Sequence, residues 1–178
     1  GMVKPAEDNM LAVTNDGRKA ALDLRLVDSL AVDHPGSKVN VCCDNVYAIW
    51  ERTKATRSAQ LVFCDLSTPT KDGSYSVYND LRSKWIARGI PESEIAFIHD
   101  YDSDASKAKL FKQVREGIVR ILLGSTQKMG MGTNVQTRLI ANHHLDCPWR
   151  PADVEQRDGR IERQGNMNDV IEIYRYVT

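Results

Sequence analysis

Two arginines and a glutamine near the end of the chain have types and a spacing suited to chemistry. Gln156, Arg160 and Arg163 occupy positions i, i+4 and i+7, so on a helix they project from one face. Converging guanidinium groups suit a polyphosphate, because each is planar, permanently charged and able to bond two oxygens at once. An arginine directed at a terminal phosphate stabilises the charge that develops as the phosphoryl group leaves, an effect of about 10³–10⁵ in rate. Taken alone, an R-x-x-R pair is more often a solvated helix face with acidic neighbours, here Glu155, Asp158 and Glu162.

A glycine-rich segment, residues 124–135, directly follows the apolar run Ile121-Leu122-Leu123. Glycines after a strand let backbone N–H groups face an anion without an intervening side chain. A dinucleotide-binding G-x-G-x-x-G is excluded, because reading it from Gly130 places Val135 where the third glycine belongs. The sequence also contains no G-x-x-x-x-G-K-[ST] phosphate-binding loop. By itself, the segment is most simply interpreted as a structural turn.

These residues need a scaffold, and the chain alternates between short apolar runs and amphipathic stretches. The runs are typical of strands buried on both faces, and the stretches between them carry apolar residues at helical spacing. This alternation with short links predicts an α/β fold, a parallel sheet with helices on both faces. Ligands of such sheets bind beyond the carboxyl ends of the strands, where both candidate segments fall. Predicted strands cover 60–64, 95–98, 119–123, 139–145 and 170–177, and predicted helices cover 38–56, 75–88, 103–115 and 153–164.

The N-terminal part of the chain lacks this alternation. The turn signal Asn15-Asp16-Gly17 precedes a stretch, 18–30, that fits one or two short helices. Ser37, which follows Pro35-Gly36, is predicted to be the N-cap of the next helix. We therefore expect residues 1–56 to form an N-terminal helical extension that packs on a lobe formed by residues 57–178.

Composition limits the classes of function. The 178 residues include 24 Lys+Arg and 24 Asp+Glu, so the formal net charge is zero. A module held to nucleic acid mainly by charge would usually be basic, so any such contact must be local or shared with a partner. No apolar run approaches the ~18 residues of a membrane span, and we expect no membrane partner. The cysteines form no C-x-x-C pair and predict reduced thiols in a cytoplasmic protein: Cys42, Cys43, Cys64 and Cys147.

His143 and His144, followed by Asp146 and Cys147, have the chemistry of metal ligands. On a strand, however, the two histidines point to opposite faces, and their spacing matches no zinc pattern. We therefore predict no metal site, with one imidazole packed and the other at the strand end. The adjacent Cys42-Cys43 pair lies on the apolar stripe of its helix and is predicted to be core.

Residues 145–165, LDCPWRPADVEQRDGRIERQG, closely resemble motif VI and its approach in SWI/SNF-type helicases of superfamily 2. In that family a strand ending in Asp and Pro-Trp leads into Q-x-x-G-R-x-x-R-x-G. Residues 124–135 resemble the family's motif V, and residues 61–69 resemble its motif IV. The 61–69 segment and the opening 9–23 are also similar to some large helicase–methyltransferase proteins of phages and mobile elements.

The resemblance implies a role for each matching residue. Arg163 matches the arginine finger and Arg160 its companion at the ATP site between two lobes, so both are candidate catalytic residues. Gln156 matches the family's leading glutamine, and Gly132 and Asn134 match positions that approach the nucleotide, which completes the candidate ATP-binding set. The candidate nucleic-acid-binding residues are Ser67, Ser125, Thr126 and Lys128.

The resemblance also implies the fold and function of the whole chain. It predicts the second, C-terminal RecA-like lobe of an ATP-dependent DNA helicase or translocase, a P-loop NTPase-type fold without a Walker A loop. An N-terminal RecA-like lobe of the same parent chain would hold most of the ATP and Mg²⁺, double-stranded DNA would be the track, and the isolated chain would be inactive. One alternative is a non-catalytic RecA-like module that binds nucleic acid or protein. Another is a Rossmann-type nucleotide enzyme, which the missing third glycine disfavours.

Overall fold

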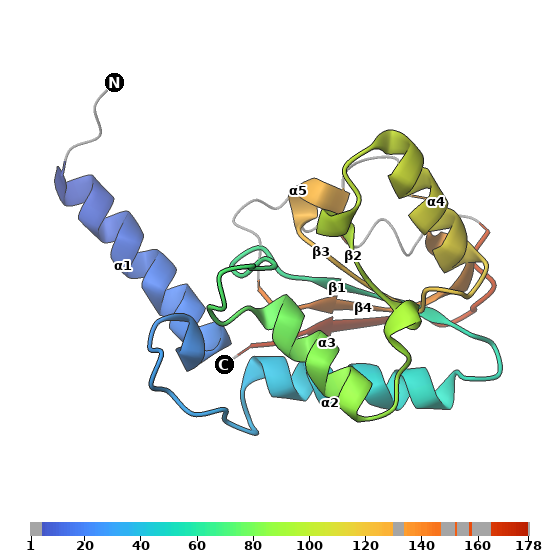
Figure 1. The fold of residues 1–178 in the computed structure, drawn as a ribbon, viewed down its shortest axis with the longest axis horizontal. Coiled ribbons are helices and arrows are strands. Elements are labelled where there is room, and N and C mark those ends of the chain that lie inside the picture. Colours follow the sequence, from blue (N-terminus) through green and yellow to red (C-terminus); the bar gives the residue numbers. More distant parts are fainter. Residues whose placement is uncertain (1–4, 130–133, 147–151, 153–156, 158–164, 178) are drawn as a thin grey trace.

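A parallel sheet lies at the centre of the computed structural model, which describes residues 5–129, 134–146, 152, 157 and 165–177 (Figure 1). Among these residues the sheet has five strands in the order β2-β3-β1-β4-β5, and every neighbouring pair is parallel. All residues of the four strands β1 to β4 are buried, which explains the nearly continuous apolar sequences of β1, β2 and β3. The strands are β1 Ala59–Phe63, β2 Ile95–Phe97, β3 Ile121–Gly124, β4 Leu139–His144 and β5 Glu172–Arg175.

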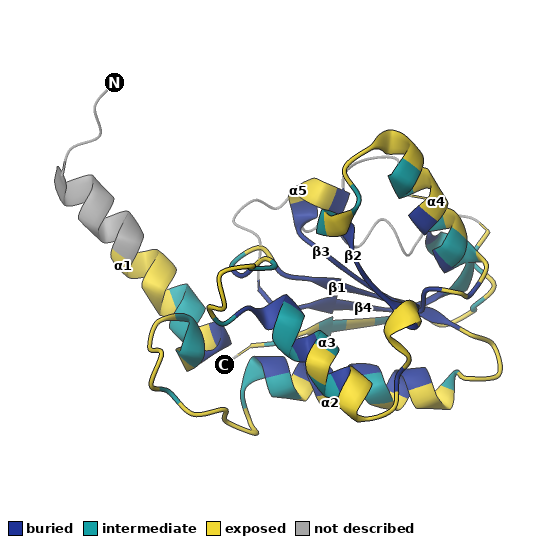
Figure 2. Ribbon diagram, viewed as in Figure 1, coloured by how far each residue is buried: buried dark blue, intermediate teal, exposed yellow. Residues whose placement is uncertain are grey.

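Helices cover both faces of the sheet. The helices α2 (Lys38–Arg52) and α3 (Val77–Ala87) lie on one face, and α4 (Asp104–Arg115) and the short α5 (Thr126–Met129) lie on the other (Figure 1). Each face has its own apolar cluster, because successive strand residues point to opposite sides. Figure 2 shows the buried sheet between helices whose outer sides are exposed. The predicted parallel α/β fold is confirmed.

Serine residues are the N-caps of the three long helices that cover the sheet. The Ser37 hydroxyl accepts a hydrogen bond from the Asn40 N–H, so the predicted N-cap of α2 is confirmed. Ser76 has the same position at α3, and Ser103 forms a capping box with Ser106 at α4. These caps set where each helix begins and therefore which face it buries.

The N-terminal segment differs from its sequence prediction. Helix α1 runs without a break from Pro5 to Leu22, so the turn predicted at Asn15-Asp16-Gly17 is wrong. Glycine and asparagine inside a helix cost only about 1 kcal/mol or less relative to alanine, which the surrounding turns can offset. Of the stretch 18–30, the structure makes the end of α1 and a 3₁₀ turn, η1 (Leu24–Leu26). The first turns of α1 extend away from the sheet, while Leu22 at its end is buried in the apolar cluster under α2 and α3 (Figure 1).

Four further sequence predictions concern the helix 153–164, the cysteines, a membrane span and the domain boundary. The predicted helix 153–164 lies outside the described residues except for Arg157. Cys42, Cys43 and Cys64 are buried free thiols, and the first two are core as predicted. Within the described part of the chain, no helix is both long and apolar enough to cross a membrane. The boundary after residue 56 stays a prediction, although α2 packs directly against α3 and the sheet.

Candidate functional site

A buried arginine, Arg157, connects three segments at the carboxyl edge of the sheet. Its side chain is fully buried, and its guanidinium lies 5.1 Å from the centre of the Phe63 ring. An arginine has five N–H donors, and here each has an acceptor, which is the condition under which a buried charge is tolerated. Nε donates to the Thr126 hydroxyl (2.7 Å), Nη1 to the Asp146 carbonyl (2.7 Å) and His144 Nδ1 (3.2 Å), and Nη2 to the carboxylates of Asp65 (2.8 Å) and Asp146 (3.1 Å).

The two aspartates follow neighbouring parallel strands, which is why they meet. Asp65 comes two residues after β1 and Asp146 two residues after β4, and the carboxyl ends of these strands lie at one edge. The Asp146 side chain is only 4% exposed, whereas that of Asp65 is 36% exposed and forms the outer side of the cluster. The second oxygen of Asp146 accepts from the backbone N–H groups of Asp65 and Leu66, each at 2.7 Å. Asp146 thus fixes the start of the loop after β1 while it pairs with Arg157.

The turn after β3 joins the same cluster through Thr126. Its backbone N–H donates to Asp65 Oδ1 at 2.7 Å, and its hydroxyl donates to Asp65 Oδ2 at 2.9 Å. The turn can begin so close to its neighbours because residue 124 is a glycine. A Cβ on Gly124 would lie 2.7 Å from Met129 Cγ and 2.9 Å from Ile98 Cγ2, distances that side-chain carbons do not reach without a shift.

The candidate site residues predicted from the sequence have different environments. Ser125 and Thr126 are buried, and the Ser125 hydroxyl accepts from the Lys128 N–H at 3.2 Å. Lys128 is exposed on α5, and Asn134 is exposed with its carbonyl accepting from Arg115 Nη1 at 2.6 Å. The structure therefore brings Ser125, Thr126 and Lys128 onto one turn beside Arg157. Four further candidates lie outside the described residues: Gly132, Gln156, Arg160 and Arg163.

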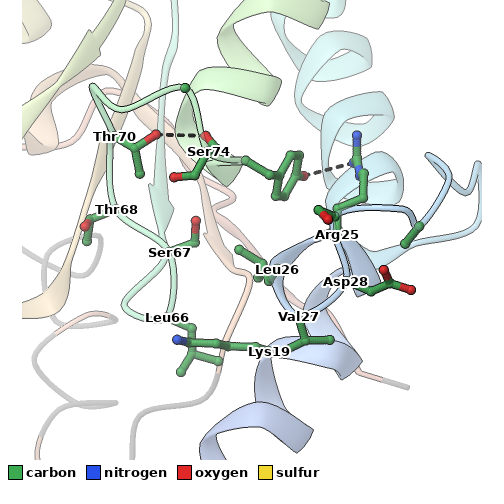
Figure 3. Close-up of a pocket in the computed structure, with 14 residues that line it drawn as sticks. Lys19, Arg25, Leu26, Val27, Asp28, Leu66, Ser67, Thr68, Thr70 and Ser74 are labelled. Atoms are coloured by element: carbon green, nitrogen blue, oxygen red, sulfur yellow. Dashed lines mark hydrogen bonds between the residues drawn. The ribbon is translucent and has the colours of Figure 1, made fainter.

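Ser67 lies apart from this turn, on the loop that begins at Asp65. Its hydroxyl accepts from the Val77 N–H at 3.0 Å, so it holds the loop against the start of α3. The loop lines one side of a cavity of about 760 Å³ whose other side is the N-terminal segment, with Lys19, Arg25 and Leu26 (Figure 3). Asp146, through its bonds to the start of this loop, connects the loop with the Arg157 cluster.

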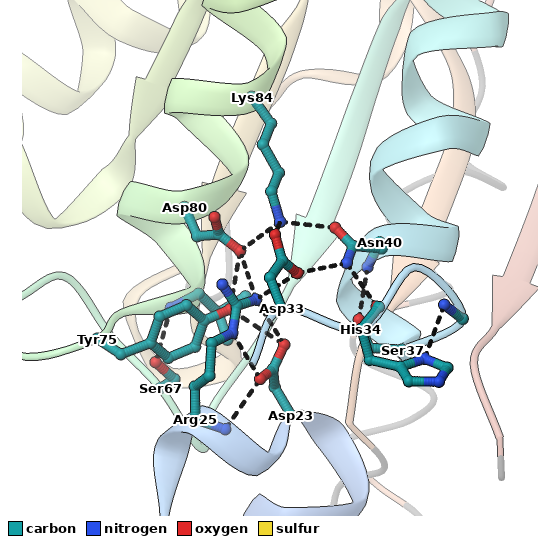
Figure 4. Close-up of polar contacts among 12 residues, drawn as sticks. Asp23, Arg25, Asp33, His34, Ser37, Asn40, Ser67, Tyr75, Asp80 and Lys84 are labelled. Atoms are coloured by element: carbon teal, nitrogen blue, oxygen red, sulfur yellow. Dashed lines mark hydrogen bonds and ion pairs between the residues drawn. The ribbon is translucent and has the colours of Figure 1, made fainter. Parts of the chain in front are cut away.

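A network of ion pairs holds the N-terminal segment in place. Arg25 contacts Asp23 at 2.8 Å and Asp80 of α3 at 3.0 Å, and Lys84 contacts Asp33 at 2.8 Å (Figure 4). Burial acts against the charge of Asp23, yet hydrogen bonds from Arg25 hold the pKa of its carboxyl below the ordinary value. Burial raises the pKa of Tyr75, whose hydroxyl donates to the Asp80 carboxylate. The network stabilises the wall of the cavity and balances the charge of Arg25, one of the cations that line it.

His143 is packed inside the lobe, and His144 is the last residue of β4, as predicted for this pair. His143 Nε2 lies 2.7 Å from the side-chain oxygen of Gln60, whose amide donates to the Val46 carbonyl. That oxygen can only accept, so Nε2 carries the proton and Nδ1 accepts from the Tyr176 hydroxyl at 2.8 Å. Burial, with a smaller effect of His144, lowers the pKa of His143 to about 3. The imidazole is therefore neutral and structural.

The sequence assigns no role to Arg157 or Asp65, and Asp146 enters only as a discounted metal ligand and as the Asp that ends the strand before motif VI. Arg157 lies in the arginine motif but is not one of the residues whose spacing places them on one helix face, Gln156, Arg160 and Arg163. A usable signal was present in the two aspartates, which each directly follow a predicted buried strand at one sheet edge. What the sequence could not show is that a cation from a distant segment lies between them.

The parallel sheet with helices on both faces places this lobe in the class of RecA-like α/β folds. The chain belongs to the family of helicase conserved C-terminal domains, whose model matches residues 37–165. It is 26% identical over 167 residues to an uncharacterized ATP-dependent helicase, YqhH, of Bacillus subtilis (strain 168). That match covers 90% of this chain and 27% of YqhH, so the chain spans about a quarter of the length of that relative.

A solved structure shares the fold. The C-terminal part of the Fun30 ATPase domain superimposes with a TM-score of 0.56 at 17% identity, covering 82% of this chain and 43% of that one. At this level of identity the likeness establishes the RecA-like fold of the lobe.

Proposed function

We propose that this chain is the second motor lobe of an ATP-dependent DNA helicase or translocase of the SWI/SNF type. Family membership over residues 37–165 supports this, as does the absence of a G-x-x-x-x-G-K-[ST] loop from the sequence. A lobe of this kind completes an ATP site whose phosphate-binding loop belongs to an N-terminal RecA-like lobe of the same parent chain. A cytoplasmic location and an origin among phage or mobile-element helicase–methyltransferases stay predictions.

The observation that carries the proposal is the anchoring of Arg157. Its five hydrogen bonds fasten the arginine motif to the ends of β1 and β4 and to the turn after β3. Ligands of doubly wound sheets bind at this edge. Arg160 and Arg163 follow Arg157 by three and six residues, so covalent chain length alone limits their Cα distances from it to about 11 and 22 Å.

In the proposed ATP site, Arg163 is the arginine finger and Arg160 its companion. Both would stabilise the charge that develops on the transferred phosphoryl group, while Gln156, Gly132 and Asn134 would approach the nucleotide. Among the described residues no cluster of three His, Cys, Asp or Glu could hold a metal ion, and the proposal assigns Mg²⁺ to the partner lobe. ATP bound between the lobes would close them, and hydrolysis would let them open.

In the proposed nucleic-acid track, Lys128 makes the charged contact. Its side chain is exposed, and its charge adds to burial in lowering the pKa of the neighbouring His99, against the opposite effect of Asp100. The other proposed nucleic-acid-binding residues are Ser125, Thr126 and Ser67. Their hydroxyls already form hydrogen bonds within the lobe, so we propose that they shape the loops that contact the nucleic acid. Double-stranded DNA is the proposed track, and the neutral overall charge means that binding depends on such local contacts.

The test compares Arg163→Ala with Arg52→Ala in the lobe joined to its native upstream partner lobe. Arg52 is the control, since it is an exposed arginine whose ion-pair partner among the described residues is Glu172, near the amino edge of the sheet. We expect Arg163→Ala to lower kcat for ATP by about 10³-fold or more while nucleotide binding persists. Arg52→Ala should keep the wild-type rate. If Arg163→Ala turns over ATP at the wild-type rate, the lobe is a non-catalytic binding module and the motor proposal fails.

A further inference from the structure

Arg157 contacts both sides of the proposed machinery. Toward the nucleic-acid side it bonds Asp65, the first residue of the loop that contains Ser67, and Thr126, on the turn that contains Lys128. Toward the nucleotide side it is part of the arginine motif itself, and its backbone carbonyl accepts from the Asn142 side chain of β4 at 3.0 Å. Asp65 and Thr126 complete the junction, since the Asp65 carboxylate accepts from both Thr126 and Arg157.

The geometry of the guanidinium makes this connection stiff. Its donors form a planar fork, so a displacement of the Asp65 loop or the Thr126 turn relative to the motif must break or bend several bonds together. The fork also lies in the interior, where hydrogen bonds are stronger and water does not replace a lost partner. A lysine at this position would keep the charge and lose the fork.

We propose that Arg157 couples nucleic-acid binding to ATP turnover by holding the arginine motif in register with the Asp65 loop and the Thr126 turn. This inference rests on the proposed function. Because Arg157 is fully buried, it touches neither ATP nor nucleic acid and acts through Arg160 and Arg163. It is a positioning residue.

The decisive measurement is the ratio of ATPase rates with and without linear double-stranded DNA, in the lobe joined to its upstream partner lobe. We expect Arg157→Gln to lower this stimulation ratio about 10-fold or more, with a smaller change in the KM for ATP. Arg157→Lys should recover only part of the ratio, because the charge returns without the fork.

A second buried arginine provides the control for stability. Arg120 is 1% exposed and donates to the carbonyls of Ser58 (3.1 Å) and Trp50 (2.8 Å), but it lies at the opposite, amino edge of the sheet. Arg120→Gln should lower Tm as Arg157→Gln does and leave the stimulation ratio unchanged. If both variants lower the ratio equally, Arg157 is merely structural and the inference is overturned.

Asp65→Asn decides the case even if Arg157→Gln does not fold. The Asp65 side chain is 36% exposed, so loss of its charge is tolerated better than loss of the buried arginine. We expect about a 5-fold lower stimulation ratio, and no further loss when Asp65→Asn is added to Arg157→Lys, since both act through one contact. A wild-type ratio in Asp65→Asn, or effects that multiply in the double variant, would overturn the coupling role. Arg163→Ala separates the two proposals: if it abolishes turnover while the Arg157 and Asp65 variants keep the ratio, only the coupling role fails.

Discussion

Arg157 Nη2 and Asp146 Oδ1 lie 3.1 Å apart in an ion pair whose side chains are 0% and 4% exposed. The pair lies where β4 ends beside β1, the arrangement that also brings Asp65 next to Asp146. Around this pair the loop after β1, the turn after β3 and the arginine motif are joined. Stability and the proposed function therefore depend on the same contact.

Breaking this pair should be costly. Asp146→Asn removes one of the two carboxylates that balance Arg157 and disturbs the acceptor of two loop N–H groups, so we expect the free energy of unfolding to fall by about 1–3 kcal/mol. Urea denaturation of the chain, followed by tryptophan fluorescence, measures this loss. The control is Glu116→Ala, which removes an exposed pair with Lys112 at 3.8 Å and should change stability by less than about 0.5 kcal/mol. A loss below about 1 kcal/mol in Asp146→Asn would contradict the prediction.

Two glycines should respond to alanine with opposite signs. Gly124→Ala places a Cβ against Met129 and Ile98, and we expect the overpacking to lower the free energy of unfolding by about 1–3 kcal/mol. Gly17, inside α1, has nothing within 4 Å of an added Cβ, so Gly17→Ala should stabilise its helix by up to about 1 kcal/mol. Circular dichroism during thermal unfolding distinguishes the two. A neutral Gly124→Ala would show that the turn after β3 has room that the structure does not show.

Acid should destabilise the lobe through His143. Its pKa is lowered to about 3 by burial, so the unfolded chain binds a proton near pH 6.5 that the folded lobe does not. The stabilising effect is complete above pH 6.5 and is lost as the pH falls toward 3, at about 1.4 kcal/mol per pH unit. Urea denaturation between pH 7 and pH 5 should show this slope, and His143→Gln should reduce it by that amount. An unchanged slope in the variant would mean that other groups cause the acid sensitivity.

The chain by itself should not hydrolyse ATP. It contains no G-x-x-x-x-G-K-[ST] loop, the sequence motif that binds the β- and γ-phosphates in P-loop ATPases. A phosphate-release assay on the purified 178 residues should give only background, and the same lobe joined to its upstream partner should turn over. Robust turnover by the chain alone would contradict the division of labour between two lobes.

Much of the fold could be predicted because burial leaves a direct trace in the sequence. Runs such as Leu61-Val62-Phe63 and Ile121-Leu122-Leu123 are apolar at every position, since both faces of the sheet are covered. The error at Asn15-Asp16-Gly17 has the opposite origin. Turn residues weaken a helix by small local amounts, and the turns on either side decide whether it continues.

The candidate site likewise has a part that could be predicted from the sequence and a part that could not. A motif of about twenty residues is enough to recognise the family, because the spacing of its glycine and arginines is local information. The partners of Arg157 are not local: Asp65 and Thr126 are 92 and 31 residues away in the chain.

The sequence alone therefore determined the class of fold, the family resemblance and the candidate arginines, since each depends on residue types within a short window. Only the tertiary structure decided that Ser125 and Thr126 turn their hydroxyls inward, and that the residues at this edge bond Arg157. The physical reason is that parallel strands place their carboxyl ends side by side regardless of the length of chain between them. A buried charge then takes whatever partners that edge supplies.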